Sequence, residues 1–378
     1  MNNSWWVNEN ELDDYQKKVI ELDPYGNCLV QGPPGSGKTN LLALRAKYLQ
    51  ALGRHNFAFI AFTRGLKAFL DFGLKQYRIG EDAIFTYFSW AHRLCRNHGV
   101  ELKYDGKFDD NREYISVILK DIVNSKNYHP DFDTILLDEA QDYTIQEVEI
   151  FKAAAENLML VADSRQRIFS NSESDIELIE RLVDAKFDLP FHYRNGHKIC
   201  QLADAVDNTG NKISGSSNYK EKENPSRVDH KQYKSIDEAM QHLVDNISDQ
   251  LIAYPGENIG IICPTRTMLD KLQAIKSSKI GKNCSFHFDD ETVDFSSGKS
   301  IYCLTLHSAK GMEFRTVHMF GWDVFRMSLV RNVIYTAITR AKTTLSVYYV
   351  SHPHRPLMQA LESLNPRATK PKISELFS

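Results

Sequence analysis

Short apolar runs recur along the chain, and each is followed by a stretch with the spacing of an amphipathic helix. In the N-terminal half these runs lie at 27–31, 57–62, 82–87, 133–138 and 158–162. Short apolar strands that alternate with helices are typical of parallel βαβ units whose sheet is covered on both faces. The first half of the chain therefore predicts one α/β domain.

A second series of apolar runs predicts a second α/β domain. Its strands are expected at 187–191, 258–263, 284–288, 301–306, 316–320 and 344–350. The expected organisation is an N-terminal tail (1–10), a first domain (11–185) with a small helical insertion at about 91–130, a second domain (186–352) and a C-terminal tail (353–378). The polar stretch 208–234, rich in Asn, Ser, Lys and Glu, is expected to be a surface excursion.

Composition narrows the class of protein. The chain has 378 residues and a net charge of −3, so a nucleic-acid partner would need a local basic groove. The six cysteines form no CxxC pair and no zinc spacing. No apolar run approaches the roughly 18 residues of a membrane span, and the N-terminus does not resemble a signal peptide. A cytoplasmic location is expected.

Residues 32–39, GPPGSGKT, carry a nucleotide-binding signature between a predicted strand and a predicted helix. Gly35 and Gly37 would let the backbone curl so that its N–H groups face phosphate oxygens, and Ser36 between them is expected to bind the nucleotide as well. Lys38 would reach the β- and γ-phosphates and Thr39 would ligate Mg²⁺, which makes ATP and Mg²⁺ the expected cofactors. The alternative is a glycine turn that binds nothing.

A second acidic motif, ILLDEAQD at 135–142, ends an apolar strand in carboxylates. Asp138 would hold the metal and its water shell beside the P-loop, and Glu139 would orient or deprotonate the attacking water. The alternative is a solvated acidic loop. A weaker signal is the echo of AFTR (61–64) in CPTR (263–266), which is either chance or the mark of two related domains that present a Thr-Arg pair to one ligand.

With these motifs in place, the chain resembles the UvrD/Rep-like branch of superfamily 1 helicases over about residues 11–350. The resemblance implies two RecA-like P-loop NTPase domains with parallel sheets flanked by helices. The segments that carry it are DYQ (14–16), AFTR (61–64), TYFSW (86–90), VADSRQ (161–166), FHYRN (191–195), TLHSAKGMEF (305–314) and YTAITRAK (335–342).

The resemblance assigns roles to residues around ATP. Gln16 would hydrogen-bond the adenine and Tyr193 would stack on it, while Glu313 would bind the ribose. Gln166 would sense the γ-phosphate. Arg194 and Arg340 would reach from the second domain as arginine fingers. For a lone arginine, the alternative is a surface ion pair.

The same resemblance gives candidates for contact with single-stranded nucleic acid, which would be held by hydroxyls, arginines and stacked rings. They are Phe62, Thr63, Arg64, Thr86, Trp90, Thr265, Arg266 and His307. The aromatic members have a structural alternative, because Phe62 ends a buried strand and Trp90 lies at the start of a helix. The alternative for either ring is that it packs in the hydrophobic core and does not contact nucleic acid.

Three departures from the family pattern limit the expectation of strong solo unwinding. The large inserted domains of the relatives are missing. The sensor motif continues as Ile168-Phe169 in place of a family tryptophan, so the base-stacking pin is lost unless Phe169 takes its role. The arginine usually found after the P-loop threonine, near the base, is Asn40.

The leading hypothesis is an ATP-dependent translocase and helicase on single-stranded DNA, moving 3′ to 5′ by family resemblance. The alternative is a nucleic-acid-gated ATPase subunit that controls a partner nuclease in DNA repair or phage defence. A nucleotide switch without turnover is a third reading, although Glu139, Gln166, Arg194 and Arg340 are all present. An RNA substrate is not excluded, because phosphate contacts and stacking do not reject the 2′-hydroxyl.

Overall fold

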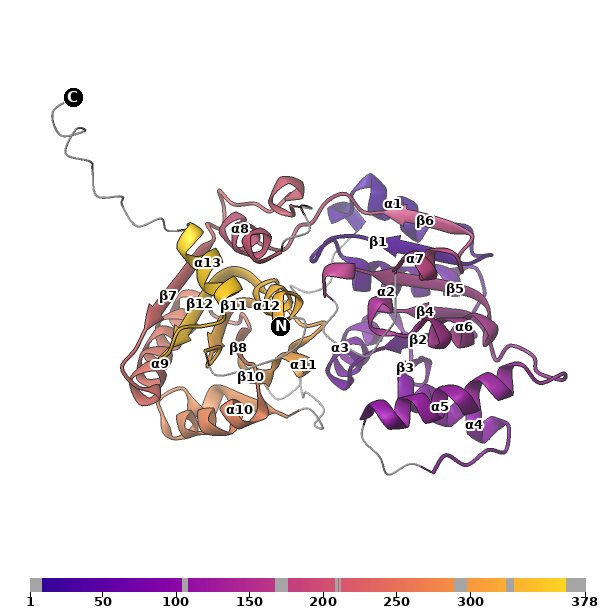
Figure 1. Cartoon of the computed structure of the whole chain (residues 1–378). Coiled ribbons are helices and arrows are strands. Elements are labelled where there is room, and N and C mark those ends of the chain that lie inside the picture. The colour runs from indigo at the N-terminus through magenta and orange to yellow at the C-terminus, as the bar shows by residue number, and fades with distance from the viewer. Residues whose placement is uncertain are drawn as a thin grey trace.

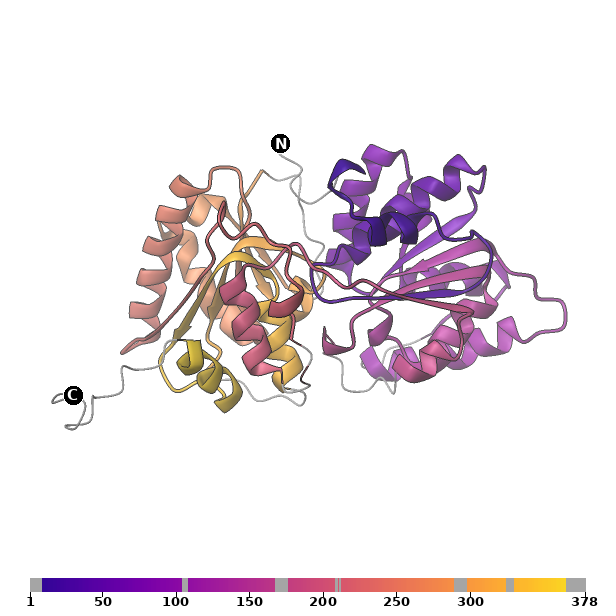
Figure 2. The same ribbon diagram turned by 90° about the horizontal axis from the view of Figure 1, so that it is seen from above.

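Two six-stranded sheets organise the chain in the computed structural model, which describes residues 9–103, 108–166, 176–207, 210, 212–288, 298–323 and 330–364. The sheets form two lobes that lie side by side (Figures 1 and 2). Every strand pair in both sheets is parallel, as expected for two RecA-like α/β domains. In the described part of the chain, no helix has the length and apolarity needed to cross a membrane.

The first sheet has the strand order β3-β2-β4-β5-β1-β6. Its strands are β1 (Cys28–Gln31), β2 (Phe57–Ala61), β3 (Ile84–Thr86), β4 (Phe132–Leu137), β5 (Ala155–Ala162) and β6 (Ala185–Asp188). Along β2, Phe57, Phe59 and Ala61 pack into one core while Ala58 and Ile60 pack into another. Side chains alternate between the two faces of a strand, so helices must cover both faces.

The helices of the first domain form these two cores. One face packs against α1 (Asp14–Ile20), α2 (Lys38–Ala51) and α3 (Arg64–Leu74). The other packs against α4 (Tyr87–Asn97), α5 (Phe108–Val123), α6 (Ile145–Ala153) and α7 (Ile176–Glu180). Helices α4 and α5 supply the helical element expected near 91–130, and α5 extends along the outer side of the lobe (Figure 1).

The second sheet has the order β7-β12-β11-β8-β10-β9. Its strands are β7 (Arg227–Gln232), β8 (Ile259–Cys263), β9 (Cys284–His287), β10 (Ile301–Thr305), β11 (Phe314–Phe320) and β12 (Ala341–Tyr349). One face is covered by α8 (His197–Val206), α11 (Leu306–Ala309), α12 (Val330–Ile338) and α13 (Arg355–Leu364). The other is covered by α9 (Ile236–Ala253) and α10 (Arg266–Leu272).

The strand expected at 187–191 was wrongly assigned to the second domain. The observed strand, β6, pairs with β1 at the edge of the first sheet, in the register Cys28↔Ala185. The expected boundary after residue 185 therefore falls inside a strand of the first domain. The expected strand began two residues too late because the fully buried apolar residue of this segment, Leu189, lies just past the end of β6 and packs into the first core.

The excursion expected at 208–234 was wrong for its last part. Residues Arg227–Gln232 form β7, which pairs with β12 alone and lies at the edge of the second sheet. Most of its side chains are exposed or half-buried, so the strand lacks the apolar run by which the others were recognised. Ahead of it, Ile213 is buried in the core of the second domain.

The C-terminal tail expected at 353–378 was also wrong in part, because it contains α13. This helix packs on α8 and buries Leu357, Ala360 and Leu361 in the core of the second domain. The remainder of that tail, 365–378, and residues 1–8 of the expected N-terminal tail lie outside the described residues. Residues Glu9–Glu11 form a short 3₁₀ turn before α1.

If α13 is part of the core, Leu357→Ala will destabilise the protein by about 2–5 kcal/mol, because the change leaves a cavity around a fully buried side chain. Urea unfolding followed by circular dichroism measures the effect. The control is Ile252→Ala on α9, where the side chain is 81% exposed and the change should stay within about 0.5 kcal/mol. Equal, small effects of the two substitutions would mean that α13 is not held by the core.

Candidate active site and nucleic-acid interface

The P-loop connects β1 to α2 through two glycines in the left-handed region, Gly35 (φ +77°) and Gly37 (φ +86°). Gly37 is the N-cap of α2, and no side chain caps that helix, so its first N–H groups face the loop. Lys38 Nζ donates to the carbonyl oxygens of Gly32 (2.9 Å) and Pro33 (3.0 Å). Burial lowers the pKa of Lys38, and the nearby carboxylates of Asp163 and Glu139 oppose that shift.

The hydroxyl and carboxylate expected to hold Mg²⁺ are already in contact, because Thr39 Oγ1 donates to Asp138 Oδ2 at 2.7 Å. Burial, followed by the neighbouring Glu139 carboxylate, raises the pKa of Asp138 to about 7. No group of three or more His, Cys, Asp or Glu among the described residues could hold a metal by itself. A hydroxyl and one carboxylate suit Mg²⁺, which commonly completes its shell with water and substrate phosphates.

Glu139 lies two residues after the end of β4 and has a left-handed backbone (φ +52°, ψ +46°) that is unusual for a residue with a side chain. Its carboxylate accepts a hydrogen bond from Gln141 Nε2. Gln141 Oε1 in turn accepts from the backbone N–H of Asp163 (3.0 Å), three residues before the expected sensor Gln166. The Glu139 side chain thus lines the cavity and is held in place by Gln141.

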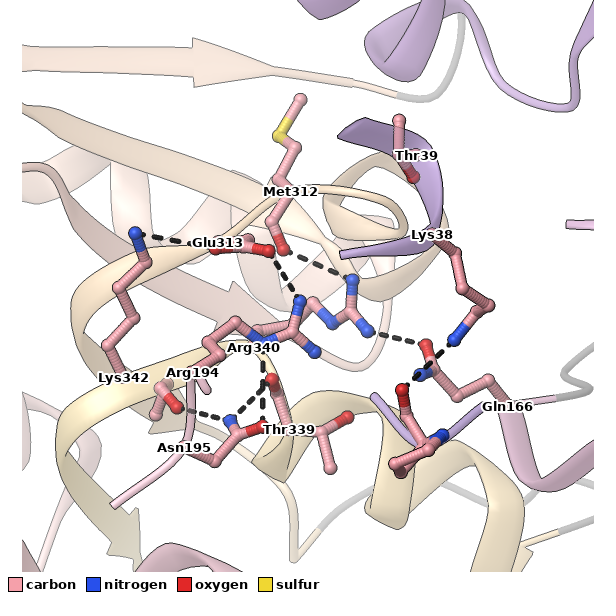
Figure 3. A network of polar contacts seen from close by, with 12 residues as sticks. Lys38, Thr39, Gln166, Arg194, Asn195, Met312, Glu313, Thr339, Arg340 and Lys342 are labelled. Atoms are coloured by element: carbon pink, nitrogen blue, oxygen red, sulfur yellow. Dashed lines mark hydrogen bonds and ion pairs between the residues drawn. The ribbon is translucent and has the colours of Figure 1, made fainter. Parts of the chain in front are cut away.

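Two arginines of the second domain reach this site (Figure 3). Arg340, 2% exposed, donates from Nη2 to Gln166 Oε1 (2.5 Å) and from Nη1 to the carbonyl of Met312 (3.1 Å). Burial lowers the pKa of Arg340 to about 10, so its guanidinium stays charged at neutral pH. The bond from Arg340 puts one expected finger in direct contact with the expected γ-phosphate sensor, Gln166. Gln166 Nε2 also donates to Asp163 Oδ2 (3.2 Å).

Arg194 lies on the P-loop, since a Cβ added to Gly35 would come within 2.5 Å of Arg194 Cβ. Its Nη1 donates to Glu313 Oε1 (2.7 Å), while Lys342 Nζ lies 3.3 Å from the other oxygen of Glu313 (Figure 3). Burial would raise the pKa of Glu313, but the two cations outweigh it and lower the pKa to about 2. Arg194 Nη2 is buried and has no partner among the described residues, as fits a group that binds an oxyanion.

The residues expected around the base meet at the start of α1. Asp13 caps this helix, and Gln16 completes the capping box. Gln16 Nε2 also donates to the carbonyl of Ser36 (2.9 Å), which fastens α1 to the P-loop. From the second domain, the Tyr193 hydroxyl donates to the Asp13 carboxylate and its backbone N–H donates to Gly35 O (3.0 Å).

One cavity of about 570 Å³ joins these groups. The expected ATP-site residues that line it are Gln16, Gly35, Gly37, Lys38, Thr39, Asp138, Glu139, Gln166, Tyr193, Arg194, Glu313 and Arg340. Ser36 is fully buried behind the loop and does not line it. Asn40, expected near the base, also lines it. The lining residues that the sequence did not assign are Asn10, Glu11, Phe69, Asn218, Tyr219, Lys220, Gly311, Arg315 and Lys342. Lys342 could have been found from its place in YTAITRAK, whereas 218–220 lie in a polar stretch without a motif.

A buried ion pair joins the two domains beside the cavity. Lys310 Nζ, at the end of α11, contacts Asp142 Oδ2 and donates to Gln166 O (2.7 Å). Neither charged side chain exceeds 1% exposure. On the far side, Arg112 of α5 donates to Asp142 O (2.8 Å) and pairs with Glu147. Lys310 and Asp142 lie inside recognised motifs, but no sequence signal pointed to Arg112.

The candidate nucleic-acid threonines occupy matching places in the two domains. Thr63 follows β2, and Thr86 is the last residue of the neighbouring strand β3. They cap α3 and α4, accepting from Leu66 N (3.1 Å) and Ser89 N (3.3 Å). Thr265 follows β8 and caps α10 in the same way. The strand next to β8 ends in Thr305, which caps α11 and was not among the candidates. The echo of AFTR in CPTR therefore corresponds to equivalent strand ends.

The charged candidates lie near these caps. Arg64 and Arg266 are exposed at the first positions of α3 and α10, and the Arg266 guanidinium lies 5.1 Å from the Phe288 ring centre. His307 is half-buried in α11, which packs against α3 across the domain junction. Of these candidates, Arg64 and His307 lie on two helices that contact each other across the domain junction, α3 and α11.

The expected stacking role of Trp90 is wrong. Its ring is 1% exposed, lies in the core of the first domain and is 4.5 Å from the Phe151 ring centre, because it projects from the buried face of α4. Phe62 is half-buried, with Tyr143 at its edge and the Arg112 guanidinium 5.1 Å from its centre. Phe169 lies outside the described residues.

Comparisons with known proteins match two parts of the chain. A family model described as an AAA domain matches residues 16–171, and one described as a UvrD-like helicase C-terminal domain matches 300–348. Among solved structures, the C-terminal domain of a possible DNA helicase from Lactobacillus plantarum WCFS1 is 15% identical, over 46% of this chain and 96% of that chain. Its TM-score of 0.34 is too low to support an argument. A search of curated proteins finds no match.

Lys310→Met will destabilise the protein by about 3–5 kcal/mol, because it leaves the Asp142 carboxylate buried without its cation. Adding Asp142→Asn removes that charge and should recover most of the loss. Lys279→Met is the control, since its pair with Asp245 is more than half exposed and contributes at most about 1 kcal/mol. Urea unfolding of the four proteins tests this; failure of the double variant to recover would exclude an unpaired charge as the cause.

Glu313→Gln will lower the thermal unfolding midpoint at neutral pH, because it removes the anion between Arg194 and Lys342. A pKa lowered from 4.5 to about 2 on folding means that this stabilisation is complete above pH 4.5 and is lost as the pH falls towards 2. The difference between wild type and variant should therefore shrink on acidification within that window. A difference that is constant with pH, or equal to that of the exposed control Glu223→Gln, would contradict the ion-pair role.

Proposed function

We infer from the matches to an AAA domain and a UvrD-like helicase C-terminal domain that the chain is a UvrD/Rep-like, helicase-type ATPase. We propose that it hydrolyses ATP to move along single-stranded DNA in the 3′ to 5′ direction. The observation that carries the proposal is the shared cavity. Lys38 and Glu139 enter it from the first domain, and Arg194 and Arg340 enter it from the second. A ligand in this cavity would touch both domains, so its hydrolysis would change the contacts between them.

The first domain would supply the groups that bind the phosphates and the general base for the attacking water. The P-loop N–H groups and Lys38, released from the carbonyls of Gly32 and Pro33, would bind the β- and γ-phosphates. Thr39 and Asp138 would hold Mg²⁺, which neutralises charge on the phosphate oxygens when bound. Glu139, held by Gln141, would accept the proton of the water that attacks the γ-phosphorus as the bond to the β–γ bridging oxygen breaks.

The second domain supplies the positive charge for the transferred group. Arg194 has an unpartnered nitrogen beside the P-loop, and Arg340 contacts Gln166, so both would turn to the γ-phosphoryl oxygens as arginine fingers. Once the phosphate leaves, this charge pair across the cleft is lost and the domains can separate. Lys310, which contacts Gln166 O, would transmit the change to α11 and His307.

Nucleic acid would bind across the junction of α3 and α11, along the threonine caps that each domain presents at its strand ends. The hydroxyls of Thr63 and Thr265, together with Arg64 and Arg266, suit phosphate oxygens and give no sequence preference. Thr63 and Arg64 belong to the first domain, and Thr265 and Arg266 to the second. Opening and closing of the cleft would therefore change the distance between the two phosphate-binding sites. Repeated cycles would then move the strand.

A second candidate is a nucleic-acid-gated ATPase subunit that controls a partner nuclease in DNA repair or phage defence. It is favoured by the small size of the described insertion, α4 and α5, and by the loss of Trp90 to the core. With Phe62 half-covered by Arg112 and Tyr143, the stacking surface among the described candidates is small. Such a chain could bind single strands yet unwind poorly.

The test is steady-state ATP hydrolysis with and without single-stranded DNA, duplex DNA and RNA. Single-stranded DNA should stimulate turnover strongly. Glu139→Gln should bind ATP without hydrolysing it, and Arg340→Ala should lower turnover by roughly 10³-fold or more. Arg227→Ala, which removes a mostly exposed arginine paired with Asp229, is the matched control and should leave the rate unchanged.

The outcomes separate the two candidates. Stimulation by single strands, with ATP-dependent displacement of a bound block from one end only, supports the translocase and gives its polarity. Stimulation without movement favours the gated subunit. Turnover indifferent to every nucleic acid, or an unchanged rate in Arg340→Ala, would reject a shared active site coupled to nucleic acid.

A further inference from the structure

Arg112 is a buried cation on α5, outside all the motifs that the sequence singled out. It is 8% exposed, and its Nε donates to Glu147 Oε1 (2.6 Å) while its Nη2 contacts the other carboxylate oxygen. The same Nη2 donates to the backbone carbonyl of Asp142 (2.8 Å). Glu147 is 1% exposed and also accepts from Thr144 N (2.8 Å). Because a buried charge needs a partner, this carboxylate fixes the guanidinium in one place.

Three aromatic rings surround the Arg112 guanidinium, each within the roughly 6 Å over which a cation is attracted to a ring centre. They are Phe62 (5.1 Å), Tyr143 (5.7 Å) and Tyr87 (5.8 Å). In the sequence, the first ring stands next to Thr63 and the third next to Thr86, both of them candidates for contact with nucleic acid. The second ring directly follows Asp142, at the end of the acidic motif. Arg112 therefore lies where the candidate strand-binding segments and the acidic motif meet.

The contact with Arg112 holds the Phe62 ring from inside the domain. Phe62 is half-buried whereas Arg112 is buried, so the guanidinium lies on the inner side of the ring. Tyr143 packs edge-on against the same ring, with the two ring centres 5.1 Å apart. The solvent-exposed part of Phe62 thus has a fixed orientation, and any nucleobase can stack on such a ring because every base has a π-face.

The other contact of Arg112 leads to the ATP cavity. Asp142, whose carbonyl accepts from Arg112, contacts Lys310 of the second domain through its carboxylate. Lys310 donates to Gln166 O (2.7 Å), and Gln166 lines the cavity. Contacts therefore run without a gap from Phe62 to Gln166. A continuous set of packed and hydrogen-bonded groups of this kind can carry coupling between two sites.

We propose that Arg112 is a positioning residue that makes ATP turnover depend on the bound strand. The inference rests on the proposed function, in which single-stranded DNA stimulates hydrolysis. A base stacked on Phe62 would immobilise the ring and, through Arg112, the turn that contains Asp142. That turn keeps Lys310 and Gln166 in place for hydrolysis. Without Arg112, the strand could still bind to the threonine caps and their neighbouring arginines, but its binding would no longer affect Gln166.

The main variant is Arg112→Met combined with Glu147→Gln, which leaves no unpaired buried charge and keeps the capping box of α6. The readout is kcat with saturating oligothymidylate divided by kcat without it. This ratio should fall roughly tenfold, within the usual range of coupling between two sites, while KM for ATP keeps its wild-type value. Arg112→Lys retains a cation for Glu147 but lacks the planar fork that also reaches Asp142 O. It should fold like the wild type and recover only part of the stimulation.

A second variant tests whether the coupling passes through the ring. Phe62→Leu should lower the stimulation ratio to the same extent, and adding it to the Arg112 variant should cause no further loss, because the two side chains act as one unit. The matched control is Arg93→Met on α4. The Arg93 guanidinium lies 5.2 Å and 5.4 Å from the ring centres of Phe85 and Phe132, and it bonds to Asp82 O (3.3 Å). It makes the same kind of contact away from Asp142 and should keep the wild-type ratio.

Thermal unfolding of every variant separates coupling from folding. Arg112→Lys decides the question if the double variant does not fold. A wild-type stimulation ratio in a folded Arg112 variant would overturn the role of Arg112 and leave the ATPase proposal intact. An equal loss in Arg93→Met, or losses from Phe62→Leu and the Arg112 variant that multiply, would do the same. A wild type that does not hydrolyse ATP, or whose turnover ignores oligothymidylate, would overturn the proposed function and the role of Arg112 with it.

Discussion

The contact between Lys310 and Asp142 fixes how the two domains meet. Both charges are removed from water, so the pair is favourable only while each retains the other and the surrounding hydrogen bonds. Lys310 also donates to Gln166 O, and Gln166 accepts from Arg340. Gln166 is thereby held by two cations of the opposite domain. The position of Arg340 relative to the P-loop depends on this junction.

A second cross-domain contact serves the opposite end of the cavity. Arg194 is held between the P-loop glycine and Glu313, and Tyr193 reaches the cap of α1. The segment that follows β6 therefore lies against the phosphate loop before the chain enters the second sheet. In this structure Glu313 accepts from Arg194 and pairs with Lys342, so it organises positive charge; its expected contact with a ribose stays a prediction.

Much of this site was predictable from the sequence, because its residues lie directly after buried strands. Asp138 and Gln166 follow long apolar strands, and the glycines around Lys38 need left-handed backbone. Edges were harder. β7 is polar because one of its sides has no neighbouring strand, so its alternation is weak. Arg112 is a charged residue in an amphipathic helix, a pattern that ordinarily predicts a solvated face, yet it is buried against Glu147.

The left-handed backbone of Glu139 has a consequence for the whole chain. A residue with a Cβ in this region carries conformational strain of about 1–3 kcal/mol, and glycine would adopt it without strain. The strain turns the carboxylate out of the strand direction and towards the cavity, where Gln141 holds it. Glycine at this position would relax the loop and remove the carboxylate at the same time. The carboxylate is therefore held towards the cavity at the expense of local stability, and the surrounding cores of the first domain supply the difference.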